Sequence, residues 1–164
     1  MKVTVGFSRH KGFAPMSSLI RWYMGTEFSH TYFKVQLQGL DTPSVLQATG
    51  KGVSMCSYSN FLAHNAVVRE FSLEVSDALF YRIYNDFHLQ AGTKYGYWQN
   101  LGILIARAFK LKINPFQDGI VCSEYVAYCL EDVFPNDWDS NKQDFNLVMP
   151  KAIYEYLTNK DIEV

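Results

Sequence analysis

Residues 121–133 read VCSEYVAYCLEDV, and this stretch carries the strongest structural signal in the chain. Its apolar positions repeat at steps of three and four residues, the spacing of one helix face: Val126, Cys129, Leu130 and Val133. The pattern predicts an amphipathic helix with Cys122 near its N-terminal end. Backbone N–H groups and the helix dipole stabilise a thiolate at that position, so we expect the pKa of Cys122 to lie below its usual value of about 8.5. Cys122 is therefore a candidate nucleophile.

A strand that carries a histidine is predicted far upstream of this helix. From Phe28 to Gln38 apolar and polar residues alternate with the period of a β-strand. The core face is formed by Phe33, Val35 and Leu37, and the non-core face by His30, Tyr32, Lys34 and Gln36. After a turn at 39–43, the residues from Ser44 to Thr49 indicate a second strand. Antiparallel pairing of the two strands would bring Gln47 near His30.

The remaining patterns place helices before and after a group of strands. A first strand is expected from Lys2 to Phe7, a helix from Pro15 to Gly25, and a further strand from Val67 to Leu73. Ser76 is a plausible N-cap for a helix that runs to Gly92, and a second apolar helix surrounds residues 101–109. This order predicts an α+β fold in which an antiparallel sheet packs against helices.

Composition limits the class of protein. A chain of 164 residues fits one domain, 1–164, and 48 % hydrophobic with 19 % charged residues is an ordinary globular balance. The net charge is -1, without a sustained basic stripe, which argues against a nucleic-acid partner. The longest apolar run, Leu101 to Ala106, is far shorter than the roughly 20 residues of a membrane-spanning helix. The first residues show no secretory pattern, so we expect synthesis in the cytoplasm; an envelope or virion role stays open.

Three cysteines, in no C-x-x-C spacing, predict neither a disulfide scaffold nor a metal site, and no cofactor is expected. Cys129 lies on the apolar stripe of its helix and is expected to pack in the core, and Cys56 falls in a serine-rich segment expected to be a loop. For Cys122 alone, a role as a small buried apolar residue is a serious alternative. Among the histidines, His30 is the best placed base; His10 and His64 are expected in loops and His88 at a helix end.

A thiol and imidazole pair needs a third polar group that holds the ring. Gln47 on the neighbouring strand is our candidate, and an exposed strand residue without such a role is the alternative. Glu27 and Glu124 are other choices, although Glu124 would point away along its helix.

Four segments, taken in order, resemble a known family: residues 28–31 (FSHT), 45–53 (VLQATGKGV), 92–96 (GTKYG) and 121–126 (VCSEYV). Together they are similar to the circularly permuted NlpC/P60 superfamily, in particular its YiiX/YebB-like bacterial and phage branch, related to lecithin retinol acyltransferase-like proteins. The resemblance runs from about residue 5 to residue 131 and implies a papain-like fold with swapped segment order. The third polar residue of that family is often acidic, where this chain has Gln47.

The resemblance also implies chemistry at an amide, isopeptide or ester carbonyl, with Cys122 as nucleophile and His30 as base. The oxyanion would be bound by the backbone N–H of Cys122, and Tyr32 and Ser123 are candidates to line the substrate site, Tyr32 because it shares a face with His30. Three functions remain open: a cysteine peptidase or amidase acting on a peptide such as that of the cell wall, an acyltransferase or thioesterase whose apolar helix at 101–106 borders an acyl groove, and a binding module that has lost turnover.

Overall fold

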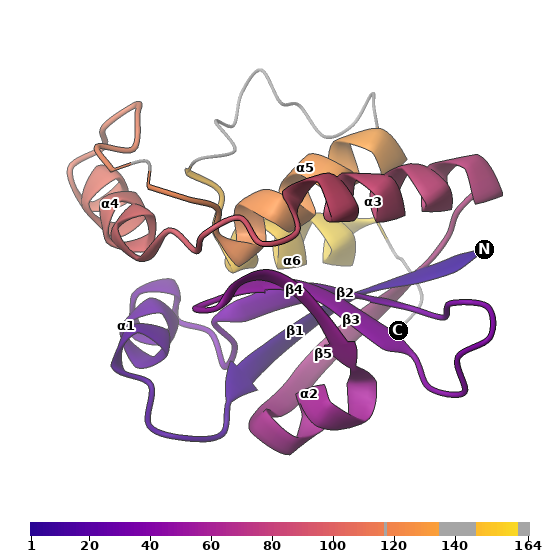
Figure 1. Ribbon diagram of the computed structural model, residues 1–164. Helices are drawn as coiled ribbons and strands as arrows, with labels where there is room; N and C mark the ends of the chain where they lie inside the picture. Colours follow the sequence, from indigo (N-terminus) through magenta and orange to yellow (C-terminus); the bar gives the residue numbers. More distant parts are fainter. Residues whose placement is uncertain (117, 135–146, 161–164) are drawn as a thin grey trace.

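The computed structural model describes residues 1–116, 118–134 and 147–160, which form one five-stranded sheet with helices on both sides (Figure 1). The strands are β1 (Lys2–His10), β2 (His30–Val35), β3 (Ser44–Thr49), β4 (Gly52–Ser57) and β5 (Asn65–Glu74). Their order in the sheet is β4-β3-β2-β1-β5, and every neighbouring pair is antiparallel. The helices are α1 (Pro15–Met24), α2 (Tyr58–His64), α3 (Asp77–Gln90), α4 (Tyr97–Ala108), α5 (Cys122–Val133) and α6 (Pro150–Asn159). The predicted α+β class with an antiparallel sheet is confirmed.

The two faces of the sheet differ in how they are covered. Helices α3, α5 and α6 lie over one face, where Phe7, Phe33 and Leu46 belong to the main core (Figure 1). On the other face the short helix α2 packs its Phe61 against Tyr32 and Val45, and these three residues form a smaller cluster. Because side chains alternate along a strand, β2 and β3 each contribute to both clusters. The prediction that the face of His30 lies outside the core was wrong at Tyr32, which is 0 % exposed beneath α2.

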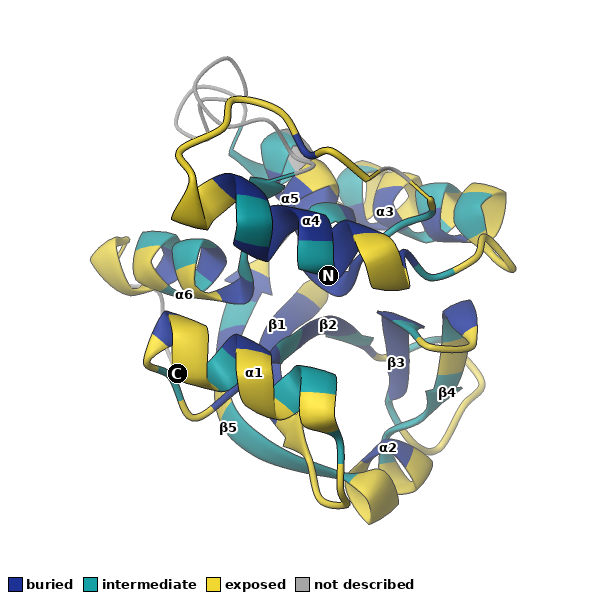
Figure 2. Cartoon of the chain, turned by 90° about the vertical axis from the view of Figure 1, so that its left-hand side faces the viewer, coloured by how far each residue is buried: buried dark blue, intermediate teal, exposed yellow. Residues whose placement is uncertain are grey.

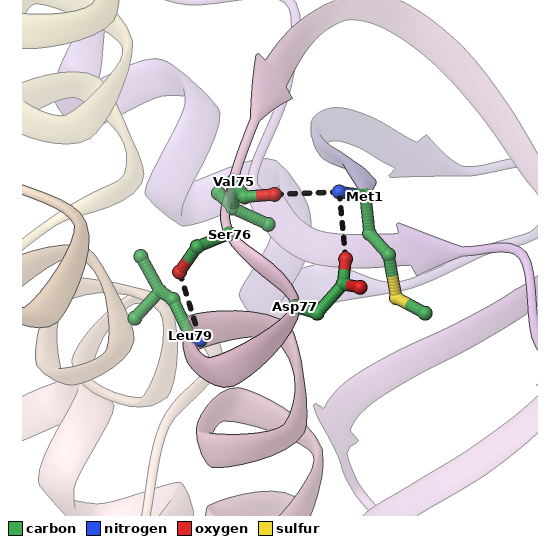
Figure 3. Close-up of polar contacts among 5 residues, drawn as sticks. All are labelled: Met1, Val75, Ser76, Asp77 and Leu79. Atoms are coloured by element: carbon green, nitrogen blue, oxygen red, sulfur yellow. Dashed lines mark hydrogen bonds and ion pairs between the residues drawn. The ribbon is translucent and has the colours of Figure 1, made fainter.

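Several predicted elements are confirmed, and their ends follow local chemistry. Helix α1 begins with Pro15 and ends at Gly25, whose φ of 64° is the left-handed conformation that glycine adopts without strain. Ser76 caps α3, since its Oγ accepts from the N–H of Leu79 at 3.2 Å (Figure 3). Beside it the amino group of Met1 donates to the carbonyl of Val75 at 2.5 Å and pairs with Asp77, which ties the start of β1 to the start of α3.

The segment from 52 to 64 and the last helix differ from the sequence-based expectation. Cys56 lies in the edge strand β4 and His64 in the last turn of α2, so neither is a loop residue. The strand holds only two buried residues, and Ser57 then caps α2 by accepting from the N–H of Asn60 at 3.3 Å. Helix α6 was also not predicted, and His10 ends β1 rather than lying in a loop. Strand β2 is shorter than the expected 28–38, since its pairing with β3 ends at Val35.

Within the described ranges no helix combines the length and apolar character needed to cross a bilayer.

Candidate active site

His30 and Gln47 form a direct contact between neighbouring strands. His30 begins β2 and Gln47 lies in β3, and the Nε2 atom of the imidazole is 2.9 Å from Oε1 of the amide. The amide is oriented by its other end, where Nε2 of Gln47 points to the sulfur of Cys56 at 3.5 Å. The proximity predicted from hairpin pairing is confirmed. Both side chains lie on the α2 side of the sheet, where the ring of His30 also packs 6.4 Å from that of Phe61.

The contact determines which nitrogen of the imidazole carries the proton. Because an amide oxygen only accepts, Nε2 of His30 carries the proton and donates to Gln47, and in the neutral ring Nδ1 then holds a lone pair. Burial lowers the pKa of His30 to about 4, although the hydrogen bond that the ring donates to Gln47 acts in the opposite direction. The ring is therefore neutral at pH 7 and has one nitrogen able to accept a proton. Among the described residues none forms a hydrogen bond with that nitrogen.

Cys122 occupies the first position of α5, as the apolar spacing predicted. The start of the helix is held by Glu124, whose carboxylate accepts from the N–H of Val121 at 3.4 Å and from Nε2 of Gln99 at 2.6 Å. Glu124 thus caps its own helix, in line with the expectation that it points away from the histidine. The side chain of Ser123 donates to the carbonyl of Val148 at 2.7 Å and fastens the segment before α6 to the same helix end.

The pKa of Cys122 moves in the direction opposite to the one expected. Burial raises it, because the residue is only 4 % exposed and a thiolate there would lose its solvation. The backbone N–H groups of Thr31, Ser123 and Cys122 itself, together with the hydroxyl of Tyr95, act to lower the pKa without reversing the shift. The prediction of a lowered pKa was therefore wrong: the helix terminus contributes as expected, and desolvation outweighs it.

Cys122 and His30 both lie at the start of β2. The thiol lies near the backbone N–H of Thr31, the residue after His30, and its helix belongs to the layer over the main core. The imidazole packs with Tyr32 and Phe61 on the α2 side. Within the described part of the chain no hydrogen bond joins the thiol to the imidazole. The structure thus unites His30 with Gln47 and brings Cys122 to the same end of β2, and among the described residues Cys122 and His30 are not hydrogen-bonded to one another.

The two candidates for lining a substrate site are both engaged elsewhere. The hydroxyl of Tyr32 donates to Glu70 at 2.8 Å and is fully buried, so its proton is not available to an oxyanion near Cys122. The side chain of Ser123 is 2 % exposed and is committed to Val148. Ser123 faces the thiol with its backbone N–H and not with its hydroxyl. We therefore do not retain the side chains of Tyr32 and Ser123 as oxyanion donors.

Tyr95 is a site residue for which the sequence suggested no role. Its hydroxyl accepts from Nδ2 of Asn100 at 2.9 Å, which leaves its own proton free to point at the sulfur of Cys122. Burial, the nearby thiol and Tyr97 raise the pKa of Tyr95, so the hydroxyl keeps that proton. Tyr95 lies in residues 92–96, one of the four segments that resemble the NlpC/P60 superfamily. That position in the sequence is the signal from which a role for Tyr95 could have been suggested.

A small cavity of about 10 Å³ borders Cys122, with room for one water molecule. Helix α4 contributes Asn100, Ile103 and Leu104 to it and α1 contributes Ile20, so the apolar helix lies beside the thiol. The cavity is far too small for an acyl chain or a peptide. A substrate therefore needs either an outward movement of these helices or an approach along the end of β2.

In the described residues no group of three His, Cys, Asp or Glu side chains is arranged to hold a metal ion. Comparison with models of protein families and with curated proteins finds no match to this chain.

Proposed function

We propose that this protein is a cysteine hydrolase of amide or isopeptide bonds, with a permuted papain-like arrangement of the NlpC/P60 type. Cys122 is the nucleophile, His30 the base and Gln47 the residue that positions the imidazole. The observation that carries the proposal is the hydrogen bond between His30 and Gln47, because it leaves Nδ1 as the basic nitrogen at the strand end where the thiol lies. A peptide of the cell-wall type is the substrate class that the sequence resemblance favours.

In the first step Nδ1 of His30 accepts the thiol proton while the sulfur of Cys122 forms a bond to the carbonyl carbon. The carbonyl oxygen takes the negative charge, and the backbone N–H groups of Cys122 and Ser123 and the hydroxyl of Tyr95 are the donors near it. The imidazolium then protonates the leaving amine as the C–N bond breaks, and a thioester remains on Cys122. Water, deprotonated by Nδ1, hydrolyses the thioester and restores the thiol.

The raised pKa of Cys122 and the lowered pKa of His30 mean that the resting pair is neutral. Proton transfer accompanies the attack on the substrate, and it requires Nδ1 and the sulfur to come within hydrogen-bond reach in the complex. An acceptor other than water, such as an alcohol or amine, would turn the same thioester chemistry into acyl transfer.

The neutral, buried thiol also favours a second candidate, a binding module of the same fold without turnover. It is supported by the missing hydrogen bond between Cys122 and His30 among the described residues. In that case the fold presents a surface, and Cys122 packs as a small apolar residue.

The two candidates are distinguished by acylation with p-nitrophenyl acetate, followed by mass spectrometry. If the protein is a hydrolase, the reagent acetylates Cys122 faster than it acetylates a model thiol, and p-nitrophenolate is released. In the His30→Asn variant the rate at Cys122 falls to that of the model thiol. Cys129→Ala, which removes the other cysteine of α5, is the matched control and keeps the full rate. Acetylation of Cys122 no faster than free cysteine, or equally fast without His30, would refute the hydrolase and favour the binding module.

A further inference from the structure

One end of the molecule exposes an unusual share of large apolar side chains. Of the sixteen such side chains exposed among the described residues, ten come from residues 9–27 and 94–116, which we name the α1–α4 end. Its most exposed members are Phe13, Trp22, Trp98, Phe109 and Ile113, at 62 % to 96 %. Scattered apolar residues are normal on a protein surface, whereas a concentration of indole and phenyl rings marks an interaction site.

The two segments lie at the same end of the fold. Ile20 of α1 and Ile103 with Leu104 of α4 line the same small cavity, so the helices are neighbours. Figure 1 places both helices beyond one end of the sheet. Figure 2 looks directly at this end, where exposed turns of α1 face the viewer and α4 is exposed at its two ends. The exposed rings of both helices thus contribute to one end of the molecule.

This end is also strongly basic in a protein that is slightly acidic. Residues 9–27 and 94–116 contain seven Lys and Arg and one acidic residue, Glu27, while the rest of the chain contains eight basic and fifteen acidic residues. From Phe109 to Ile113 large apolar and basic residues alternate, and all of them are exposed. The next acidic residue in the sequence after 116 is Asp118. Its carboxylate accepts from the N–H of Gln99 at 3.0 Å and so binds the start of α4.

We propose that the α1–α4 end docks on the surface of a membrane that contains anionic lipids. Lys and Arg at such a surface are attracted by the lipid head groups, while Trp, Phe, Leu and Ile enter the boundary with the acyl chains. Long basic side chains can reach the head groups while their neighbours are immersed, which suits the alternation from Phe109 to Ile113. An acidic protein, or a polyanion without aromatic groups, would match the charge and would leave the exposed indole and phenyl rings without a function.

The docking mode follows from the surface and does not depend on the proposed hydrolase activity. It would hold the Cys122 cavity close to the bilayer, because α1 and α4 both line it.

The test is flotation of the full chain with vesicles of phosphatidylcholine, with and without about a third of phosphatidylglycerol. We expect binding to the anionic vesicles, weakened by salt near 1 M, where the Debye length is about 3 Å. Replacing Lys110 and Lys112 by Gln should lower the partition coefficient about 25-fold, since each basic residue at an anionic surface contributes about fivefold. Phe109→Ser with Ile113→Ser should also lower it at least tenfold.

The matched controls come from the other end of the sheet and should bind as the wild type does: Lys2→Gln, an exposed lysine at the start of β1, and Leu40→Ser, an exposed leucine before β3. The proposal is overturned if the protein stays unbound with anionic vesicles, or if the controls lose as much as the α1–α4 variants. It is equally overturned if the lysine variants weaken binding while the apolar variants do not, because the surface would then recognise any polyanion.

Discussion

The imidazole of His30 donates from Nε2 to the amide oxygen of Gln47 across 2.9 Å, and this pair defines the base of the candidate site. Gln47 is in turn oriented by Cys56 on the edge strand, so three adjacent strands of the sheet fix the position of one ring. A neutral amide orients the imidazole and does little to stabilise an imidazolium. The proposed base is therefore weak in the resting protein, and its strength should respond to the residue at position 47.

Gln47→Glu should raise the pKa of His30 from about 4 toward its ordinary value of about 6.5, since a carboxylate favours the charged ring. The titration of the His30 ring by NMR measures the change. Gln38→Glu, an exposed position after the end of β2, is the control and should leave the pKa unaltered. An unchanged titration in the Gln47 variant would show that the contact does not control the ring.

Cys122 should react slowly with iodoacetamide at neutral pH, because burial keeps its thiol protonated and alkylation, unlike acylation, draws on no oxyanion donors. We expect its labelling rate to fall below that of free cysteine at pH 7 and to rise only in alkaline solution. Mass spectrometry of labelled peptides separates Cys122 from Cys56 and Cys129. Rapid labelling of Cys122 below pH 7 would contradict the neutral resting state and indicate a preformed thiolate.

The hydroxyl of Tyr95 lowers the pKa of Cys122, so Tyr95→Phe should move the labelling curve of Cys122 to higher pH. The same variant should slow acetylation by p-nitrophenyl acetate by at least about tenfold if the hydroxyl also stabilises the oxyanion. Tyr81→Phe, on the exposed side of α3, provides the comparison. A Tyr95→Phe protein with an unchanged labelling curve would assign the tyrosine to packing alone.

The parts of the fold that could be predicted are those in which apolar residues repeat with a clear period. Helices α1, α3, α4 and α5 each carry an apolar stripe, and α3 carries in addition a serine cap whose geometry is local. Strand β4 and helix α2 were missed because few of their residues are buried and the segment carries three serines without a clear apolar period. That omission led directly to the error at Tyr32, since α2 is what covers it.

The site shows the same division between local and long-range causes. The contact of His30 with Gln47 follows from the register of one hairpin, and the position of Cys122 follows from one helix, so both were accessible from sequence. The raised pKa of Cys122 depends on burial by segments far apart in the chain, including α1, α4 and residues 148–150. The nearness of Tyr95 depends on the parallel bridge between Tyr95 and Ile120, which no periodicity predicts.

The stability of the protein should fall between about pH 6.5 and pH 4. His30 stays neutral in the folded state down to about pH 4, while the unfolded chain takes up the proton near 6.5. The unfolded state therefore binds more protons in this window, and the free energy of unfolding decreases as the pH falls, by at most about 3 kcal/mol. Urea unfolding at pH 7 and pH 4.5 measures the loss. His30→Asn should reduce it and His64→Asn, at an exposed position, should not.

Glu70 connects three elements on the α2 side of the sheet. It pairs with Lys34 and accepts from the hydroxyls of Tyr32 at 2.8 Å and Tyr58 at 3.0 Å. Burial acts to raise the pKa of Glu70, and these contacts outweigh it, so the net shift is downward. The stabilisation by its carboxylate is therefore present above the unfolded pKa of about 4.3 and is lost as the pH falls through the lower folded value.

Glu70→Gln should lower the free energy of unfolding by about 2 kcal/mol at pH 7, because the variant leaves Lys34 without its counter-charge in a site that is mostly buried. The control is Glu74→Gln, an exposed residue on the same strand, which should change the stability by less than about 0.5 kcal/mol. The difference between the two variants should disappear when the pH is low enough to protonate Glu70 in the folded protein. If Glu70→Gln is as stable as the control at pH 7, the carboxylate does not hold α2 to the sheet, and the cover over Tyr32 rests on apolar contacts alone.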